Sequence, residues 1–315
     1  MSFSSTAKNE LCRMGPAKPC CQTAELSALL HMTLSVSISG GKYTLRMDTE
    51  SAAVARRAFT LIKNLFSIHA QIEMRQNHLK RNHIYSLVIQ DHEEALAVLK
   101  KTQLINKDNI FKSAGFRDAL VSRRCCKTAF LRGAFLGGGS LANPEKMYHL
   151  EFVSSTEDFA EELLKILNAF KLNAKITQRK SQYVVYLKEG DKISQFLSLI
   201  GAHASMLDFE NIRVMKEMRN NVNRTVNCET ANLSKTVNAA LRQIESIVYI
   251  KNHLGFDKLN PQLREIAELR INNPEASLEE LKEQLSEPVG KSGVNHRLRK
   301  LNEIAGDLKK EKGEF

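Results

Sequence analysis

The fold of this chain is decided by two related stretches, CCQTAELSALLHMTLSV (20–36) and CCKTAFLRGAFLGGGSL (125–141), which lie 105 residues apart. Sliding the sequence on itself by that offset gives nine identities over residues 20–61 without a gap. Self-similarity at a fixed offset is the mark of a duplicated structural unit. We therefore expect two copies of one fold, at about residues 20–105 and 125–202.

Each copy contains the same series of hydrophobic patterns. Apolar residues at helical spacing predict helices, and segments rich in β-branched and aromatic residues predict strands. The expected class is α+β, with an αββαββα order in each copy. The matching segments are 52–66 with 157–170 for a helix, HIYSLVI (83–89) with QYVVYLK (182–188) for a strand, and 94–105 with 192–202 for the closing helix.

Small residues line one face of the first helix in each copy. Ala129, Gly133 and Gly137 are spaced by four, and Ala24 and Ala28 occupy aligned positions in the first copy. A spacing of four places side chains on one helix face, and small side chains let two helix backbones approach closely. We expect these two helices to pack against each other, with the glycine run that begins at Gly137 at the close-packed end.

The composition is that of a globular protein with an anionic partner. A length of 315 residues predicts two domains, and 43% hydrophobic residues exclude collagen-like and wholly disordered classes. Lys and Arg number 46 against 35 acidic residues, which favours nucleic acid or an acidic membrane surface as partner. The chain has neither a stretch apolar enough for membrane insertion nor a signal-peptide core. We therefore expect a soluble, cytoplasmic protein.

Six cysteines occur, and a cytoplasmic protein keeps them reduced. Adjacent cysteines are expected to be poor joint ligands for one tetrahedral zinc ion, and the chain has no C-x2-C spacing. Buried thiols acting as small apolar side chains are the favoured interpretation, and no phosphate-binding glycine loop occurs. We expect no metal and no cofactor. The cysteines are Cys12, Cys20, Cys21, Cys125, Cys126 and Cys228.

The last two helical patterns of the chain have the proportions of a helix-turn-helix. Residues 275–287 carry five glutamates and one lysine, whereas residues 290–300 carry four Lys or Arg residues and no acid. This partition is expected when the first helix faces away from DNA and the second faces the groove. A basic surface helix of a plain helical bundle is the alternative. The four helical patterns are 232–254, 261–272, 277–285 and 293–308.

The last helical pattern, 293–308, divides its residues between core and solvent. Val294, Leu298 and Leu301, with Ile304 or Ala305, form the expected core stripe. Asn side chains can bind adenine and Arg side chains guanine, and basic side chains bind phosphate. The DNA-binding residues expected here are Lys291, Ser292, Asn295, His296, Arg297, Arg299 and Lys300.

Residues 203–235 break the repeat and are polar and basic. Here Arg219, Asn223 and Arg224 are expected to contact DNA if the segment is a connector that follows the duplex, and a solvated linker helix is the alternative. Other basic residues, on the expected strands and between the copies, can bind DNA or simply keep the surface soluble. They are Arg75, Lys80, Arg81, Arg179 and Lys180, and Lys112, Arg117, Arg123, Arg124 and Lys127.

The stretch LRGAFLGGG (131–139) resembles the helix that names the LAGLIDADG homing endonucleases, and LSALLHMTL (26–34) resembles it more faintly. In that family two such helices pack side by side, and each ends in a carboxylate that holds the catalytic metal. That position is Thr33 in one copy and Gly138 in the other. Because neither residue can hold a hard cation, we expect no catalytic residues and no nuclease activity.

The chain as a whole resembles the WhiA family of bacterial transcription factors and cell-division proteins. This resemblance implies a degenerate LAGLIDADG-like domain joined to a helix-turn-helix like the promoter-binding domain of sigma factors. It also implies sequence-specific binding to double-stranded DNA, a role in division or chromosome segregation (in spore-formers, sporulation) and no catalysis. It rests on KNELCR (8–13), CC-x-x-AEL (20–26), FLRGAFLGGGS with PEK-x-YHLEF (130–152), NR-x-VNCE-x-AN (223–232) and SGVNHRLRKLNEIA (292–305).

Together these patterns predict three parts: a duplicated LAGLIDADG-like domain (1–211), a basic linker (212–231) and an all-α helix-turn-helix domain (232–315). The favoured function is a non-catalytic transcription regulator at the nucleoid. Two alternatives stand beside it. One is an active homing-type endonuclease, and the other is a scaffold that binds a sigma factor, a division protein or another regulator.

Overall fold

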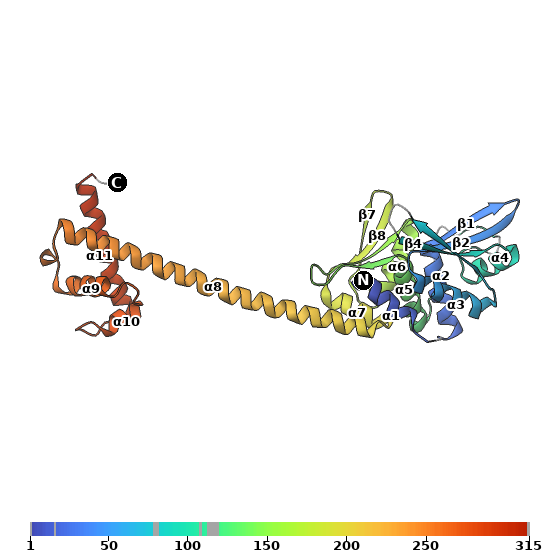
Figure 1. Cartoon of the computed structure of the whole chain (residues 1–315), viewed down its shortest axis with the longest axis horizontal. Helices are drawn as coiled ribbons and strands as arrows, with labels where there is room; N and C mark the ends of the chain where they lie inside the picture. The colour runs from blue at the N-terminus through green and yellow to red at the C-terminus, as the bar shows by residue number, and fades with distance from the viewer. Residues whose placement is uncertain (1, 16, 78–81, 107–108, 112–119, 314–315) are drawn as a thin grey trace. The chain divides into compact units, whose positions relative to one another are not determined.

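The computed structural model describes residues 2–15, 17–77, 82–106, 109–111 and 120–313 (Figure 1). The chain divides into two compact units, Met1–Glu217 and Met218–Phe315. Within the described residues, no helix is both long enough and apolar enough to cross a lipid bilayer.

The first unit contains the predicted duplication. The first copy comprises α2 (Pro19–Thr33), β1 (Leu34–Ser39), β2 (Lys42–Thr49), α3 (Ala52–Phe66), β3 (Gln71–Asn77), β4 (Asn82–Ile89) and α4 (His92–Lys101). The second comprises α5 (Arg124–Gly138), β5 (Gly139–Leu141), β6 (Leu150–Ser154), α6 (Glu157–Ala169), β7 (Lys175–Arg179), β8 (Gln182–Leu187) and α7 (Gly190–Ile200). Their antiparallel sheets have the equivalent orders β1-β2-β4-β3 and β5-β6-β8-β7. The expected α+β class and αββαββα order are confirmed.

Helices α2 and α5 pack directly against each other (Figure 1). Small residues lie where the two helices cross. A Cβ atom added to Gly133 would lie 2.0 Å from the backbone oxygen of Glu25, and one added to Gly137 would lie 2.8 Å from Cβ of Met32. Real Cβ atoms do not approach other atoms so closely, so only glycine fits at these crossing points. The predicted close packing of the two helices is therefore confirmed.

A buried ionic cluster joins the helix pair to its surroundings. Glu25 is fully buried, and its carboxylate accepts hydrogen bonds from Arg57 of α3 at 2.7 and 3.1 Å and from Arg132 of α5 at 3.1 Å. A further nitrogen of Arg57 donates to the carbonyl of Met14, and one of Arg132 donates to the carbonyl of Ile200, each at 2.7 Å. Buried charges are tolerated only when they are paired and hydrogen-bonded in this way.

A helix that the sequence patterns did not predict, α1 (Phe3–Cys12), precedes the first copy. Its Glu10 caps the first turn of α8 (His203–His253), accepting hydrogen bonds from the backbone of Ala204 at 2.8 Å and of Ser205 at 2.9 Å. Burial acts to raise the pKa of Glu10, but the hydrogen bonds from Ser205 and Ala204 outweigh it and hold this pKa below its ordinary value.

The second unit is entirely helical within the described residues. The sequence predicts a linker over 212–231 and a separate helix over 232–254, but the single helix α8 runs through both stretches. Its last turns pack with the other helices around Ile250, Ile266 and Leu298. The elements that follow are η1 (Phe256–Lys258), α9 (Pro261–Asn272), α10 (Leu278–Glu283) and α11 (Lys291–Glu311).

The close approach of α2 and α5 makes a specific prediction about stability. We expect Gly133→Ala to lower the free energy of unfolding by about 1–3 kcal/mol, because the added methyl group overlaps the Glu25 carbonyl. The matched control is Gly306→Ala, in α11, where an added Cβ meets no atom within 4 Å. That change should stabilise its helix by up to about 1 kcal/mol. Chemical denaturation followed by circular dichroism measures both, and equal effects would contradict this packing.

The buried cluster makes a second prediction. We expect Glu25→Gln to destabilise the protein by about 3–5 kcal/mol, since it leaves the Arg57 and Arg132 guanidinium groups buried without a counter-charge. Glu145→Gln, at an exposed position, is the control and should change stability by less than about 0.5 kcal/mol. Thermal unfolding of both variants checks this, and a Glu25→Gln protein as stable as the control would show that the cluster is dispensable.

Candidate nucleic-acid interface

The last two helices form the predicted helix-turn-helix. Helix α10 begins with a capping box, in which Ser277 Oγ accepts from the backbone of Glu280 at 3.2 Å and Glu280 Oε2 accepts from the backbone of Ser277 at 2.7 Å. Helix α11 begins after Gly290 and packs against α9 and α10. Its predicted core stripe is confirmed, because Val294, Leu298 and Leu301 are fully buried.

The opposite face of α11 is polar, basic and exposed. Ser292 precedes Asn295 by three residues and His296 by four, and Arg299 follows them by four and three, so the exposed side chains of all four share one face. Among the described residues, no carboxylate forms an ion pair with Arg299. Lys300 lies 3.4 Å from Glu303, but both side chains are more than half exposed, and such pairs contribute little. Together with the exposed Lys291, this face has the chemistry for binding DNA.

Arg297 does not belong to that face, although the sequence analysis places it among the DNA-binding residues. It is only 9% exposed, and its Nη2 lies 3.6 Å from Glu287 Oε2. Its Nη1 is buried without a hydrogen-bond partner among the described residues. The expectation is corrected by helical periodicity: Arg297 follows Val294 by three residues and precedes Leu301 by four, which turns it toward the core.

The three residues of the linker that were expected to contact DNA lie in the middle of α8. Arg219, Asn223 and Arg224 are all exposed. A spacing of four places Arg219 and Asn223 on one face of the helix, whereas Arg224 lies about 100° further around it. The helix is therefore solvated here, and its basic side chains are accessible to an anionic partner.

Several of the basic residues expected on the strands and between the two copies contact other side chains of the protein. Arg75 Nη2 lies 3.1 Å from Glu73, and Arg179 Nη1 lies 3.3 Å from Glu151, so acids partly neutralise both arginines. Arg124 stacks over the ring of Phe170. Lys180 occupies a turn with a positive φ of 55°, and Arg123 is the N-cap of α5. Lys80, Arg81, Lys112 and Arg117 lie outside the described residues, and Lys127 is half-buried in α5.

The helix ends that correspond to a nuclease centre carry no carboxylate. Thr33 and Gly138 are the last residues of α2 and α5. Thr33 Oγ1 donates to the carbonyl of Leu29 at 2.7 Å, and a Cβ added to Gly138 would meet Cε of Met32 at 2.0 Å. In this structure the end of the Met32 side chain occupies the space beside Gly138.

A cleft of about 810 Å³ lies beside the end of α5 and is lined by two acids, Asp48 and Glu50. Asp48 Oδ1 accepts hydrogen bonds from Ser86 Oγ at 2.5 Å and from Arg46 Nε at 3.1 Å. Its carboxylate is thus already bound within the sheet.

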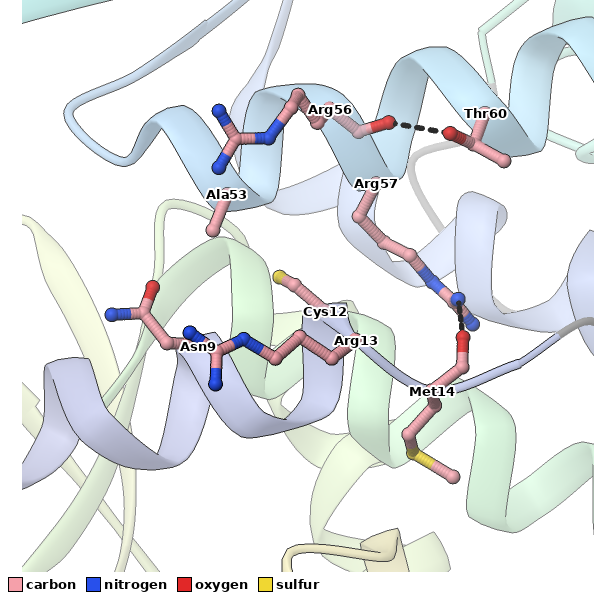
Figure 2. Close-up of a pocket in the computed structure, with 8 residues that line it drawn as sticks. All are labelled: Asn9, Cys12, Arg13, Met14, Ala53, Arg56, Arg57 and Thr60. Atoms are coloured by element: carbon pink, nitrogen blue, oxygen red, sulfur yellow. Dashed lines mark hydrogen bonds between the residues drawn. The ribbon is translucent and has the colours of Figure 1, made fainter.

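A second, smaller pocket of about 310 Å³ lies between α1 and α3 (Figure 2). Arg57 donates hydrogen bonds to Glu25 and to the carbonyl of Met14. Arg13 and Arg56 have no carboxylate partner among the described residues. Burial raises the pKa of Cys12, which also lines the pocket, to about 11, so its thiol stays protonated. The pocket therefore suits an anionic group, and sequence patterns did not reveal it.

Comparison with known proteins supports this architecture. The family models described as the WhiA N-terminal LAGLIDADG-like domain, the WhiA LAGLIDADG-like domain and the WhiA C-terminal HTH domain match residues 19–105, 127–219 and 222–305. The "Probable cell division protein WhiA" of Alkaliphilus metalliredigens is 50% identical over 309 residues, covering 97% of this chain and 98% of that protein. The chain belongs to the WhiA family.

Other WhiA proteins agree over the full length. The "Probable cell division protein WhiA" of Clostridium beijerinckii is 49% identical over 315 residues, which cover 99% of this chain and 100% of that protein. The crystal structure of full-length WhiA from Thermotoga maritima is 26% identical and covers 98% of this chain and 99% of that one, with a TM-score of 0.58. The resemblance stated from the sequence motifs is therefore confirmed.

The burial of Arg297 predicts how this WhiA chain tolerates its replacement. We expect Arg297→Met to change the free energy of unfolding by less than about 1.5 kcal/mol, because methionine fills a similar volume and removes the unpaired Nη1. Leu298→Ala, one residue away in the same core, should cost about 2–5 kcal/mol. Thermal unfolding distinguishes the two variants. A loss with Arg297→Met as large as that with Leu298→Ala would mean that the guanidinium itself holds the unit together.

Proposed function

We propose that this chain is a non-catalytic, sequence-specific DNA-binding protein that regulates transcription and acts in cell division and chromosome segregation, including sporulation in spore-forming bacteria. The observation that carries the proposal is the exposed basic face of α11, the second helix of a helix-turn-helix. The role in division is supported by the relatives, which are named cell division proteins.

The side chains of α11 have separate tasks in this proposal. Helix α11 enters the major groove, where Asn295 and Arg299 have the donors and acceptors to recognise adenine and guanine. Ser292 and His296 lie on the same face and contribute further polar contacts to base edges or phosphates. Lys291 and Lys300 flank that face and neutralise phosphates, which supplies affinity without sequence preference.

The middle of α8 extends the DNA-binding surface in this proposal. Its exposed Arg219, Asn223 and Arg224 contact the phosphate backbone, so residues 212–231 serve as a basic connector between the duplicated domain (1–211) and the DNA-binding domain (232–315). A protein with this function works in the cytoplasm, at the nucleoid. The positive net charge of +11 supports this assignment, since it favours association with DNA at long range.

The absence of catalysis is proposed from the two helix ends. Hydrolysis of a phosphodiester with divalent metals needs carboxylates at the reacting centre, and Thr33 and Gly138 supply none. The cleft lined by Asp48 and Glu50 is the feature that favours the alternative of an active endonuclease. Against that alternative, the Asp48 carboxylate is held by Arg46 and Ser86.

The proposal predicts the effect of removing the exposed charges. The full chain first selects its preferred duplexes from a random-sequence library, and the affinity for a selected duplex is then measured between about 50 and 200 mM salt with magnesium present. In the double variant Arg299→Ala with Lys300→Ala, we expect loss of the arginine to weaken the binding free energy by about 1–3 kcal/mol. Loss of the lysine should reduce the slope of log affinity against log salt concentration by about one. A denaturing gel should show intact DNA throughout.

The charge-matched control is Lys309→Ala with Lys310→Ala, at the far end of the same helix. It removes two positive charges outside the proposed face and should retain sequence preference. Equal losses in both double variants would contradict recognition through this face. Nicked DNA would instead favour the endonuclease. Binding of the wild type too weak to detect at physiological salt would favour a scaffold for a sigma factor or another regulator.

A further inference from the structure

Two pairs of cysteines meet where the duplicated helices begin. Cys20 and Cys21 lie in the first turn of α2, and Cys125 and Cys126 occupy the same positions in the first turn of α5. The two sulfur atoms within each pair are 4.0 Å apart, and all four sulfur atoms lie within 4.8 Å of one another. The duplication, which brings the two helices side by side, thus gathers four thiols at one point.

We propose that these four cysteines bind one thiophilic divalent metal ion, zinc, as a structural site with two ligands from each helix. In a tetrahedral site with Zn–S bonds of about 2.3 Å, neighbouring sulfur atoms are about 3.8 Å apart. No separation in the cluster is greater than 4.8 Å, about 1 Å more than this value, and side-chain torsions can make that adjustment. No other His, Asp or Glu is needed to complete the coordination.

From the sequence, adjacent cysteines are expected to be poor joint ligands for one zinc ion, because the two side chains of one pair leave a helix in different directions. The proposed site draws on two pairs rather than one. Here the sulfur atoms of Cys20 and Cys21 lie within 4.8 Å of those of Cys125 and Cys126, across the helix pair. Each pair therefore has to supply only one edge of the tetrahedron, and the facing pair supplies the opposite edge.

The surroundings favour the negative charge of a metal-bound thiolate cluster. All four cysteines lie in the first turn of a helix, where the helix dipole is positive. The residues that cap these helices are also basic, Lys18 for α2 and Arg123 for α5. A zinc ion with four thiolates carries a net charge of about −2, which these groups partly offset.

The type of ligand decides which metal the cluster takes. Zinc binds thiolates, so its binding releases the thiol protons to solvent. Soft sulfur ligands also select zinc over magnesium or calcium. With four protein ligands the site has no open position for a substrate, so its role is to fasten the two repeats together.

The test is metal analysis of the full chain, purified under reducing conditions after growth with zinc. We expect about one zinc per chain. Cobalt added to metal-free protein should give the intense visible absorption of a tetrahedral tetrathiolate. Cys21→Ser and Cys126→Ser should lose both signals, whereas Cys12→Ser and Cys228→Ser, which change cysteines outside the cluster, should keep them.

Two further measurements keep the outcome decisive if a buried variant fails to fold. Cys125→Ser changes the exposed member of the cluster and should weaken cobalt binding with little loss of structure. A strong chelator should lower the unfolding temperature of the wild type and of Cys228→Ser, but not that of a folded cluster variant. The proposal is overturned if reduced wild-type protein contains no zinc and binds no cobalt. It is equally overturned if mass spectrometry of the native protein shows disulfides among the four cysteines.

Discussion

The contact between α2 and α5 is the constraint on which the duplicated domain depends. The backbone oxygen of Glu25 lies against Gly133 so closely that no side chain fits between them. Each of the two helices leads directly into the first strand of its own copy, because β1 begins at Leu34 and β5 at Gly139. The helix separation therefore determines where the two equivalent sheets begin. Close packing of this kind is sensitive to the addition of a single methyl group.

The ionic cluster makes this pairing specific, and it does so with residues that the two copies do not share. At the offset of 105 residues, Glu25 aligns with Phe130, and Arg132 aligns with Ser27. Because one carboxylate in the first copy faces a guanidinium in the second, the two copies are not interchangeable. Pairing one second copy with another would leave Arg132 buried without a carboxylate, which is costly. The cluster is thus better understood as selecting one arrangement than as adding net stability.

The two ends of the helix pair differ in their chemistry. At the carboxyl ends, Thr33 bonds to its own helix and Met32 fills the space beside Gly138. At the amino ends, the four cysteines lie together in the first turns of the two helices, at the positive ends of their dipoles. In the second unit, the polar and basic residues of α11 other than the buried Arg297 lie on its exposed face, while the side that faces α9 and α10 is otherwise apolar.

The sequence by itself determined the duplication, the order of elements in each copy, the close helix pair and the helix-turn-helix, because hydrophobic periodicity and small-residue spacing are local patterns. It also identified most of the exposed face of α11. Only the tertiary structure decided that Arg297 is buried, that Glu25 joins Arg57 and Arg132, and that the cysteine pairs meet. These contacts connect residues that lie on different helices or, for Arg297, on the edge of an apolar stripe. Their distances depend on how the helices pack, and a local pattern does not contain that information.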